Sequence, residues 1–164
     1  YEWHRGLPCV AGEAWQWPGG VRFQFLSPAE ELPRRTNNAS CVLQVEIGAT
    51  RLLLPGDIEE QRERTLVRYW GAALHSHWLL AAHHGSKTSS AWSLLKWVDP
   101  QYVAVSAGYA NRFGHPHADV SQRYRELSAA TASTAEGGAL LYWIDPENGV
   151  SLRQYRHLGR RFWM

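Results

Sequence analysis

The sequence has few cysteines, no long apolar run and little excess charge of either sign, and each absence excludes a class of protein. Two cysteines in 164 residues are too few for a disulfide-rich miniprotein. The longest apolar runs, such as 78–82, are far shorter than the roughly 18 residues that a membrane-spanning helix needs. We see no basic, then apolar, then small-residue start that would indicate a secretory signal. The chain can still be a soluble piece of a larger membrane protein.

Lysine is also scarce, so arginine carries almost all of the positive charge. Lysine and arginine together number 17, against 15 acidic residues, and the only lysines are Lys87 and Lys96. The guanidinium group suits phosphate and carboxylate partners. A net charge of +2 is nevertheless too small to indicate nucleic-acid binding by itself. An arginine-rich composition is equally typical of a GC-rich genome.

Composition and pattern together predict an α/β fold. The apolar fraction of 45% and the charged fraction of 20% are typical of a globular chain, and the length suits one domain or most of one. The first third is rich in strand patterns, and the remainder alternates strands with helices. We expect strands within 15–26, 41–47, 51–54, 78–82, 102–106, 139–144 and 150–155. We expect helices over 59–70 and 118–130, and another that runs through 97 with Ser89 or Ser90 as its N-cap.

Polar residues come directly after three of the predicted strands. Asp57 follows one buried strand, His83 follows the next, and Ser106 ends a third. The loop after Ser106 then contributes further side chains, which are Asn111, His115 and His117. Because sites in α/β sheets form at the carboxyl ends of the strands, we expect these side chains to share one edge.

Each of these residues also has a purely structural interpretation. Asp57 can be a metal ligand or the N-cap of the helix that follows. If the strand continues, only one of His83 and His84 can face a given pocket. The segment from Gly85 to Ser89 suits either a phosphate or an ordinary capping turn.

The two late histidines are a possible ligand pair. Pro116 separates His115 from His117 and restricts the backbone around them. Two histidines do not make a metal site, because tetrahedral zinc needs about four donors. Arg112 lies within reach of a substrate phosphate in the same loop. Cys9 and Cys41 can be paired or reduced, and we predict that they lie close enough to bridge.

Three sequence blocks in this order resemble one protein family. They are Leu-Leu-Leu-Pro-Gly-Asp-Ile-Glu at 52–59, Ala-Ala-His-His-Gly-Ser-Lys-Thr-Ser at 81–89, and Val-Ser-Ala-Gly-Tyr-Ala-Asn-Arg-Phe-Gly-His-Pro-His at 105–117. The stretches 9–15 and 37–43 are similar too. Together they resemble the ComEC-type DNA internalisation proteins of natural competence, and in particular the later part of their metallo-β-lactamase-like domain. The resemblance covers nearly all of the chain.

The resemblance implies an αββα sandwich in which a divalent metal, Zn or Mn, activates water to cleave the phosphodiesters of DNA. It implies Asp57 and His115 as metal ligands, and His83 and His84 as catalytic residues at the metal or the scissile phosphate. It assigns substrate binding to a further set, which is Ser86, Lys87, Asn111, Arg112 and His117. The implied partners are DNA and the membrane channel part of the same protein, with no small-molecule cofactor.

The chain departs from the family pattern in its first half. The family's main cluster, of the type His-X-His-X-Asp-His, has no counterpart here, and Ser27 stands where a further ligand is common. We therefore expect residues 1–164 to form a single partial domain, frayed over 1–8 and 156–164. In isolation it should hold metal weakly or not at all, and act as a nuclease only when an upstream segment completes it.

Three functions are consistent with these residues. The first is a metal-dependent nuclease domain of a bacterial inner-membrane DNA-uptake protein, on a side of the membrane that the sequence leaves open. The second is a phosphoesterase that acts on another phosphodiester, since the fold supports many reactions. The third is a non-catalytic module that guides DNA along basic residues, which are Arg34, Arg35, Lys87 and Arg112.

Overall fold

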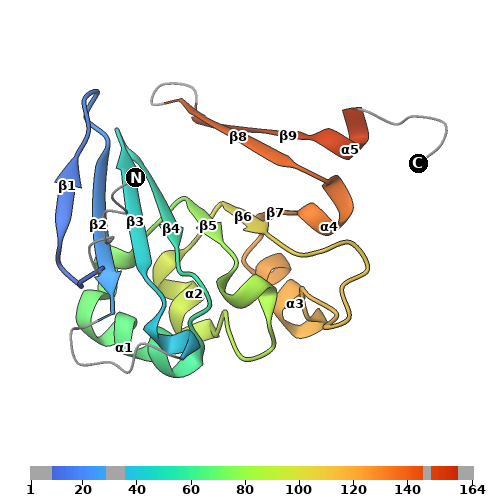
Figure 1. Ribbon diagram of the computed structural model, residues 1–164, viewed down its shortest axis with the longest axis horizontal. Coiled ribbons are helices and arrows are strands. Elements are labelled where there is room, and N and C mark those ends of the chain that lie inside the picture. The colour runs from blue at the N-terminus through green and yellow to red at the C-terminus, as the bar shows by residue number, and fades with distance from the viewer. Residues whose placement is uncertain (1–8, 29–35, 146–148, 159–164) are drawn as a thin grey trace, which may run out of the picture.

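A seven-stranded mixed sheet forms the centre of the computed structural model, which describes residues 9–28, 36–145 and 149–158 (Figure 1). The strands lie in sequence order. They are β1 (Ala14–Gln16), β2 (Arg22–Ser27), β3 (Val42–Ile47), β4 (Thr50–Leu54), β5 (Trp78–Leu80), β6 (Tyr102–Val105) and β7 (Ala130–Ser133). Pairing is antiparallel from β1 to β4 and parallel from β4 to β7. The carboxyl ends of β4, β5 and β6 therefore meet at one edge of the sheet.

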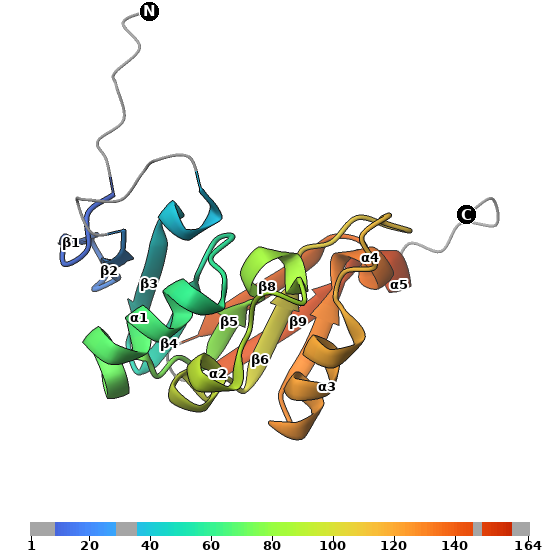
Figure 2. The same cartoon turned by 90° about the horizontal axis from the view of Figure 1, so that it is seen from below.

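Helices cover one face of this sheet (Figure 2). They are α1 (Glu60–Trp70), α2 (Trp92–Val98) and α3 (Ala118–Glu126), and three 3₁₀ turns connect other elements, which are η1 (Asn37–Ala39), η2 (Gly71–Leu74) and η3 (Ala82–Gly85). Each helix buries apolar side chains against the sheet, including Leu66, Leu94 and Val120. This burial supplies most of the driving force that fixes the layers.

A small second sheet lies on the opposite face. It pairs β8 (Leu140–Asp145) with β9 (Gly149–Gln154), between the short helices α4 (Thr134–Gly137) and α5 (Tyr155–Leu158). Tyr142 contacts Trp78 of the main sheet edge to face, with ring centroids 5.3 Å apart. The described chain thus has a helical layer, a main sheet and a hairpin layer (Figure 2).

The mixed α/β architecture confirms the predicted α/β class, but the end of one predicted helix is wrong. The helix predicted over 118–130 ends at Glu126, and Ala130–Ser133 forms β7 instead. Ser128 has a left-handed backbone (φ 58°), which breaks the helix, and the residues that follow pair with β6. Strand pairing overrides the helical pattern because it satisfies the backbone groups of an otherwise open sheet edge.

The predicted caps of α2 are also wrong. Neither Ser89 nor Ser90 caps this helix, which begins after Ala91 with no side-chain cap among the described residues. The buried carboxylate of Glu63 on α1 accepts hydrogen bonds from the backbone N–H groups of Ser90 (2.5 Å) and Ala91 (2.8 Å). A residue from another helix therefore supplies the acceptor that a local serine was predicted to supply.

A disulfide bond joins Cys9 to Cys41 at the start of β3. Their Cα atoms lie 5.9 Å apart, which confirms the prediction that these cysteines can bridge. Of the predicted frayed ends, 1–8 and 159–164 lie outside the described residues, whereas Arg156 belongs to α5. Within the described ranges, no helix is both long and apolar enough to cross a membrane.

Candidate functional site

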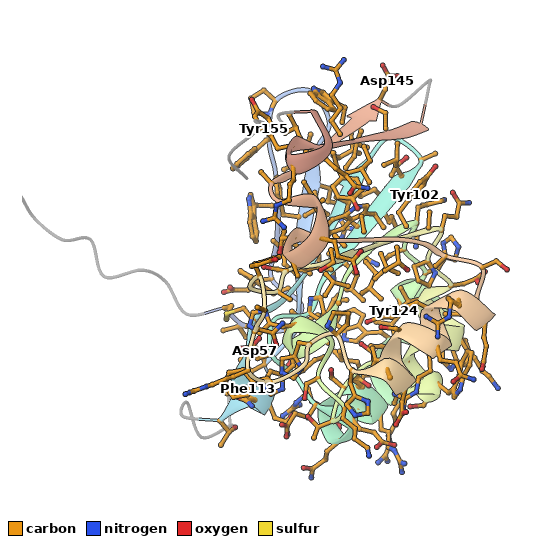
Figure 3. The ribbon with its side chains drawn as sticks, turned by 90° about the vertical axis from the view of Figure 1, so that its right-hand side faces the viewer. Asp57, Tyr102, Phe113, Tyr124, Asp145 and Tyr155 are labelled. Atoms are coloured by element: carbon orange, nitrogen blue, oxygen red, sulfur yellow. A yellow bond between two sulfur atoms is a disulfide. The ribbon has the colours of Figure 1, made fainter. Side chains whose placement is uncertain are left out.

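Four predicted site residues gather where β4, β5 and β6 end. Asp57 follows β4, His83 and His84 lie in η3 after β5, and His115 lies in the loop between β6 and α3. We call these four residues the rim. Figure 3 shows Asp57 on the same side of the molecule as Phe113, a neighbour of His115 in that loop.

Short distances connect the members of the rim. Asp57 Oδ1 lies 3.6 Å from His84 Nε2. The ring centroid of His83 lies 6.4 Å from that of His84 and 6.2 Å from that of His115. Three chain segments therefore converge, as expected from the parallel order of the strands.

Both histidines of the His83–His84 pair lie at the rim because the strand does not continue to them. β5 ends at Leu80, and both residues have left-handed backbone angles, with φ values of 49° and 59°. Such angles are unfavourable for residues other than glycine, by about 1–3 kcal/mol each. In an extended strand, successive side chains face opposite sides, so one of the two rings would point away from the rim. These two residues are not extended, so this alternation does not apply to them. Strain of this kind is concentrated at functional sites.

A backbone carbonyl sets the orientation of His84. Its Nδ1 lies 2.7 Å from the carbonyl oxygen of Ser106 at the end of β6. A carbonyl only accepts, so Nδ1 carries the proton and, in the neutral ring, Nε2 has a free lone pair. This lone pair faces the Asp57 carboxylate, and two acceptors 3.6 Å apart suit a shared cation, either a metal ion or the proton of an imidazolium.

Glu59 is a site residue that the sequence reasoning did not assign. Its Oε1 lies 3.7 Å from His83 Nδ1 and accepts a hydrogen bond from the Thr88 hydroxyl (3.1 Å). The backbone N–H of Glu59 donates to the side chain of Asn38 (2.9 Å). The signal was its position two residues after Asp57, at the end of the same block. The His83 Nδ1 atom is buried and has no hydrogen-bond partner within the described chain.

The loop between β6 and α3 is closed by Asn111. The Asn111 side chain accepts from the His115 N–H (2.8 Å) and donates to the His115 carbonyl (2.7 Å). The pKa of His115 is lowered, first by burial and then by the nearby His83, His84 and His117. The lowered pKa favours the neutral form of the His115 ring, and its buried Nδ1 has no hydrogen-bond partner in the part of the chain described.

Gly85 allows two of these segments to approach each other. A Cβ atom placed on Gly85 would lie 2.7 Å from the Cβ of Pro116, closer than real contacts permit. The His117 N–H also donates to the Gly85 carbonyl (2.9 Å). Only glycine therefore brings the segment after β5 this close to the segment that carries His115.

The remaining predicted residues divide into two groups by what they contact. Ser86 and His117 take part in local structure: the Ser86 hydroxyl lies 3.2 Å from that of Thr88, and His117 Nδ1 caps α3 by accepting from the Asp119 N–H (3.3 Å). Lys87 and Arg112 bear exposed charges, and the Lys87 ammonium lies 4.0 Å from Asp119. The exposed cations are free to approach a phosphate, because surface ion pairs contribute little.

The donors at the rim suit a divalent metal in kind but not in number. Carboxylate oxygen and imidazole nitrogen are common ligands, and the buried Nδ1 atom of His115 makes no hydrogen bond within the described chain. Among the residues that the structure describes, no three histidine, cysteine or acidic side chains are placed to hold one ion. A complete coordination sphere needs donors from beyond this set.

Comparison with known proteins relates this chain to competence proteins. The chain is 38% identical over 155 residues to competence protein ComA of Neisseria gonorrhoeae, covering 94% of this chain and 22% of ComA. It is 38% identical over 130 residues to recombination protein 2 of Haemophilus influenzae, which covers 79% of this chain and 16% of that protein. It is 32% identical over 122 residues to ComE operon protein 3 of Bacillus subtilis, which covers 74% of this chain and 16% of that protein. No protein-family model matches the chain.

These relatives confirm the resemblance to competence proteins, and they are much longer than this chain. The chain spans about a fifth of the length of the curated relatives it matches. The homologues of this chain are thus competence proteins, and it is similar to one part of them.

Proposed function

We propose that this chain is the DNA-handling part of a DNA-uptake protein in natural transformation, and that its rim acts on the phosphodiester backbone. The observation that carries the proposal is the facing pair of Asp57 and His84, which arises at the edge where His83 and His115 also lie. The similarity to competence proteins supports DNA as the ligand.

The reaction we propose is metal-dependent hydrolysis. When bound, a divalent ion such as Zn or Mn supplies an activated water and stabilises the charge that develops on the phosphate. Asp57 and His115 would hold the ion, and His83 and His84 would contact the ion or the scissile phosphate. Glu59 and the Ser106 carbonyl would orient the two imidazoles.

The fold we propose is a metallo-β-lactamase-like sandwich of which this chain forms a part. The helical layer, the mixed sheet and the β8–β9 hairpin on its other face support three of the four layers of such a sandwich. The missing donors would come from an upstream segment of the complete protein. We therefore expect the isolated chain to bind metal weakly.

The disulfide supports a location for this part of the protein. Bonds such as Cys9–Cys41 persist in oxidising compartments and are rare in the cytosol. We propose that the chain belongs to an inner-membrane protein and lies on the oxidising side of that membrane, where incoming DNA arrives.

The test is a nuclease assay of the complete protein with its metal content measured in parallel. Asp57→Asn keeps the size of the side chain and removes its charge. We expect Asp57→Asn to lower the cleavage rate at least roughly 10- to 100-fold, because even loss of a residue that only supports a metal ligand costs that much. Asp99→Asn is the control, because Asp99 precedes β6 and so lies at the other end of that strand. Equal cleavage by wild type and Asp57→Asn would refute the assignment.

A non-catalytic DNA-guiding role is the second candidate. It is favoured by the exposed cations Lys87 and Arg112 beside the rim and by the incomplete ligand set among the described residues. Arg34 and Arg35, which were predicted to contribute, lie outside the described residues. The DNA-guiding role predicts DNA binding that needs no metal and weakens steeply as the salt concentration rises. Hydrolysis predicts strict dependence on a divalent metal.

A further inference from the structure

The loop that carries His115 also presents two large aromatic side chains to solvent. Tyr109 is 79% exposed and Phe113 is 65% exposed. A single exposed aromatic residue needs no explanation. Here both lie in one short loop, beside the rim, and each has an arginine over its ring: Arg156 over Tyr109 at 5.0 Å and Arg112 over Phe113 at 4.9 Å.

The loop holds Phe113 in place without burying it. Asn111 closes the loop through the hydrogen bonds to His115 described above and a further one to the Gly108 carbonyl (3.1 Å). Phe113 lies between these anchor points and stacks on His115, with ring centroids 5.7 Å apart and planes within 16° of parallel. A ligand that uses Phe113 therefore meets a surface that has little conformational freedom left to lose.

Phe113 forms one wall of a pocket that opens beside the rim. The pocket has a volume of about 420 Å³ and is lined by His84, Ser106, Ala107, Gly108, Asn111, Phe113 and His115. Two rim imidazoles and one phenyl ring thus line this space. A flat ring system fits such walls by stacking.

We propose that this pocket holds one base of an unpaired DNA strand, stacked on Phe113. This inference rests on the proposed function and adds the kind of strand that the site accepts. In a duplex both faces of each base are covered by its neighbours, so only an unpaired base can stack on a side chain. Arg112, which lies over the Phe113 ring and outside the pocket lining, carries a guanidinium group suited to the adjacent phosphate.

The position of the pocket connects this stacking with the rim. His84 and His115 belong both to the rim and to the pocket lining. A base seated against Phe113 therefore has its own phosphates in the neighbourhood of Asp57 and His84. Tyr109 offers a second ring on the same loop for the next base along the strand.

The test measures binding of three DNA probes to the complete protein at low salt, without added metal. The probes are an unpaired strand with one 2-aminopurine, the same strand in a duplex, and a strand of the same length whose sugars carry no bases. We expect Phe113→Ala to raise the dissociation constant for the unpaired strand by roughly 5- to 150-fold, which is typical of losing one base–aromatic stack. Phe113→Trp should restore the affinity and the quenching of 2-aminopurine fluorescence.

Two controls separate stacking from other effects. Tyr69 on α1 is as exposed as Tyr109, at 76%, and is absent from the pocket lining, so Tyr69→Ala should bind all probes like wild type. The base-free strand should bind wild type and Phe113→Ala equally. If Phe113→Ala weakens the base-free strand as much as the unpaired strand, or weakens neither, the stacking proposal is wrong and DNA binding stands. If wild type binds none of the probes, this inference and the DNA-guiding role fail together, and the nuclease assay with metal then decides the hydrolytic role separately.

Discussion

Asp57 Oδ1 lies 3.6 Å from Nε2 of His84, although the two residues follow different strands of the sheet. Parallel pairing of β4 with β5 brings the strand ends together. The left-handed backbone of His84 and its hydrogen bond to the Ser106 carbonyl then turn the imidazole toward the carboxylate. The contact therefore depends on three neighbouring strands at once, and the variants below test the elements that support it.

Gly85→Ala should destabilise the protein more than Gly20→Ala, although both substitutions place alanine at a similar positive φ. The added methyl group would meet Pro116 at 2.7 Å, and the φ of Gly85 is +81°. Gly20 has a φ of +83° with nothing within 4 Å of its hypothetical Cβ, so Gly20→Ala carries the strain without the clash. We expect Gly85→Ala to lose about 1–3 kcal/mol more free energy of unfolding in urea titrations. Equal losses would show that the close approach is not required.

Removal of the disulfide should lower stability and loosen the segment that carries Asp57. Cys41 follows Ser40, whose hydroxyl oxygen accepts a hydrogen bond from the Asp57 N–H (3.1 Å). We expect the double substitution of Cys9 and Cys41 by alanine to lower the free energy of unfolding by about 2–4 kcal/mol. Reductant should destabilise wild type similarly and leave the double variant unchanged. If reductant also destabilises the double variant, then loss of the disulfide is not what destabilises wild type in reductant.

The free energy of unfolding should fall as pH rises toward neutrality, because Glu63 loses its proton over this range. Burial raises the pKa of Glu63 from 4.5 to about 7, with a smaller contribution in the same direction from Glu60. The backbone N–H groups of Ser90 and Ala91 and the charge of Arg123 act in the opposite direction. The folded state thus holds a proton that the unfolded state releases, so the stabilising effect is complete below about pH 4.5. It is lost as pH rises to about 7, a change of roughly 3 kcal/mol.

The pH dependence of Glu63 can be isolated by comparison with Glu63→Gln. Glutamine cannot ionise, so the free energy of unfolding of wild type should decline relative to this variant between pH 4.5 and 7. Other titrating groups cancel in the difference. Glu126→Gln is the control, because Glu126 is exposed and bonds only to Gln122 on its own helix among the contacts described. Parallel curves for wild type and Glu63→Gln would contradict the raised pKa.

Asn111→Ala should loosen the loop between β6 and α3 without unfolding the protein. The substitution removes three side-chain hydrogen bonds, two of them to the backbone of His115. Because the loop is partly exposed, we expect a global loss of only about 1–2 kcal/mol. Amide hydrogen exchange within 107–117 should become at least about tenfold faster, since each 1.4 kcal/mol of local stability is a factor of ten. Gln122→Ala, which removes an exposed side-chain bond on α3, should leave that exchange unchanged.

The sequence by itself determined the main elements and which residues could meet. Alternating apolar residues predicted β2, apolar-rich segments predicted β3 and β4, and the change of period after Pro55-Gly56-Asp57 predicted α1. Local periodicity suffices for these elements because each buries one face of its own. The placement of Asp57, His83 and His115 at one edge followed from strand ends, since parallel strands end on the same side.

Only the tertiary structure decided how these residues are held. The left-handed backbone that brings both His83 and His84 to the rim has no local signal, because its cost of about 1–3 kcal/mol per residue is offset by surrounding contacts. Glu59 beside His83 and Glu63 beneath α2 are likewise ordinary helix-start and helix-face glutamates in the sequence. Their partners lie far along the chain, and a hydrogen bond between distant segments exists only once the sheet and its helices have packed.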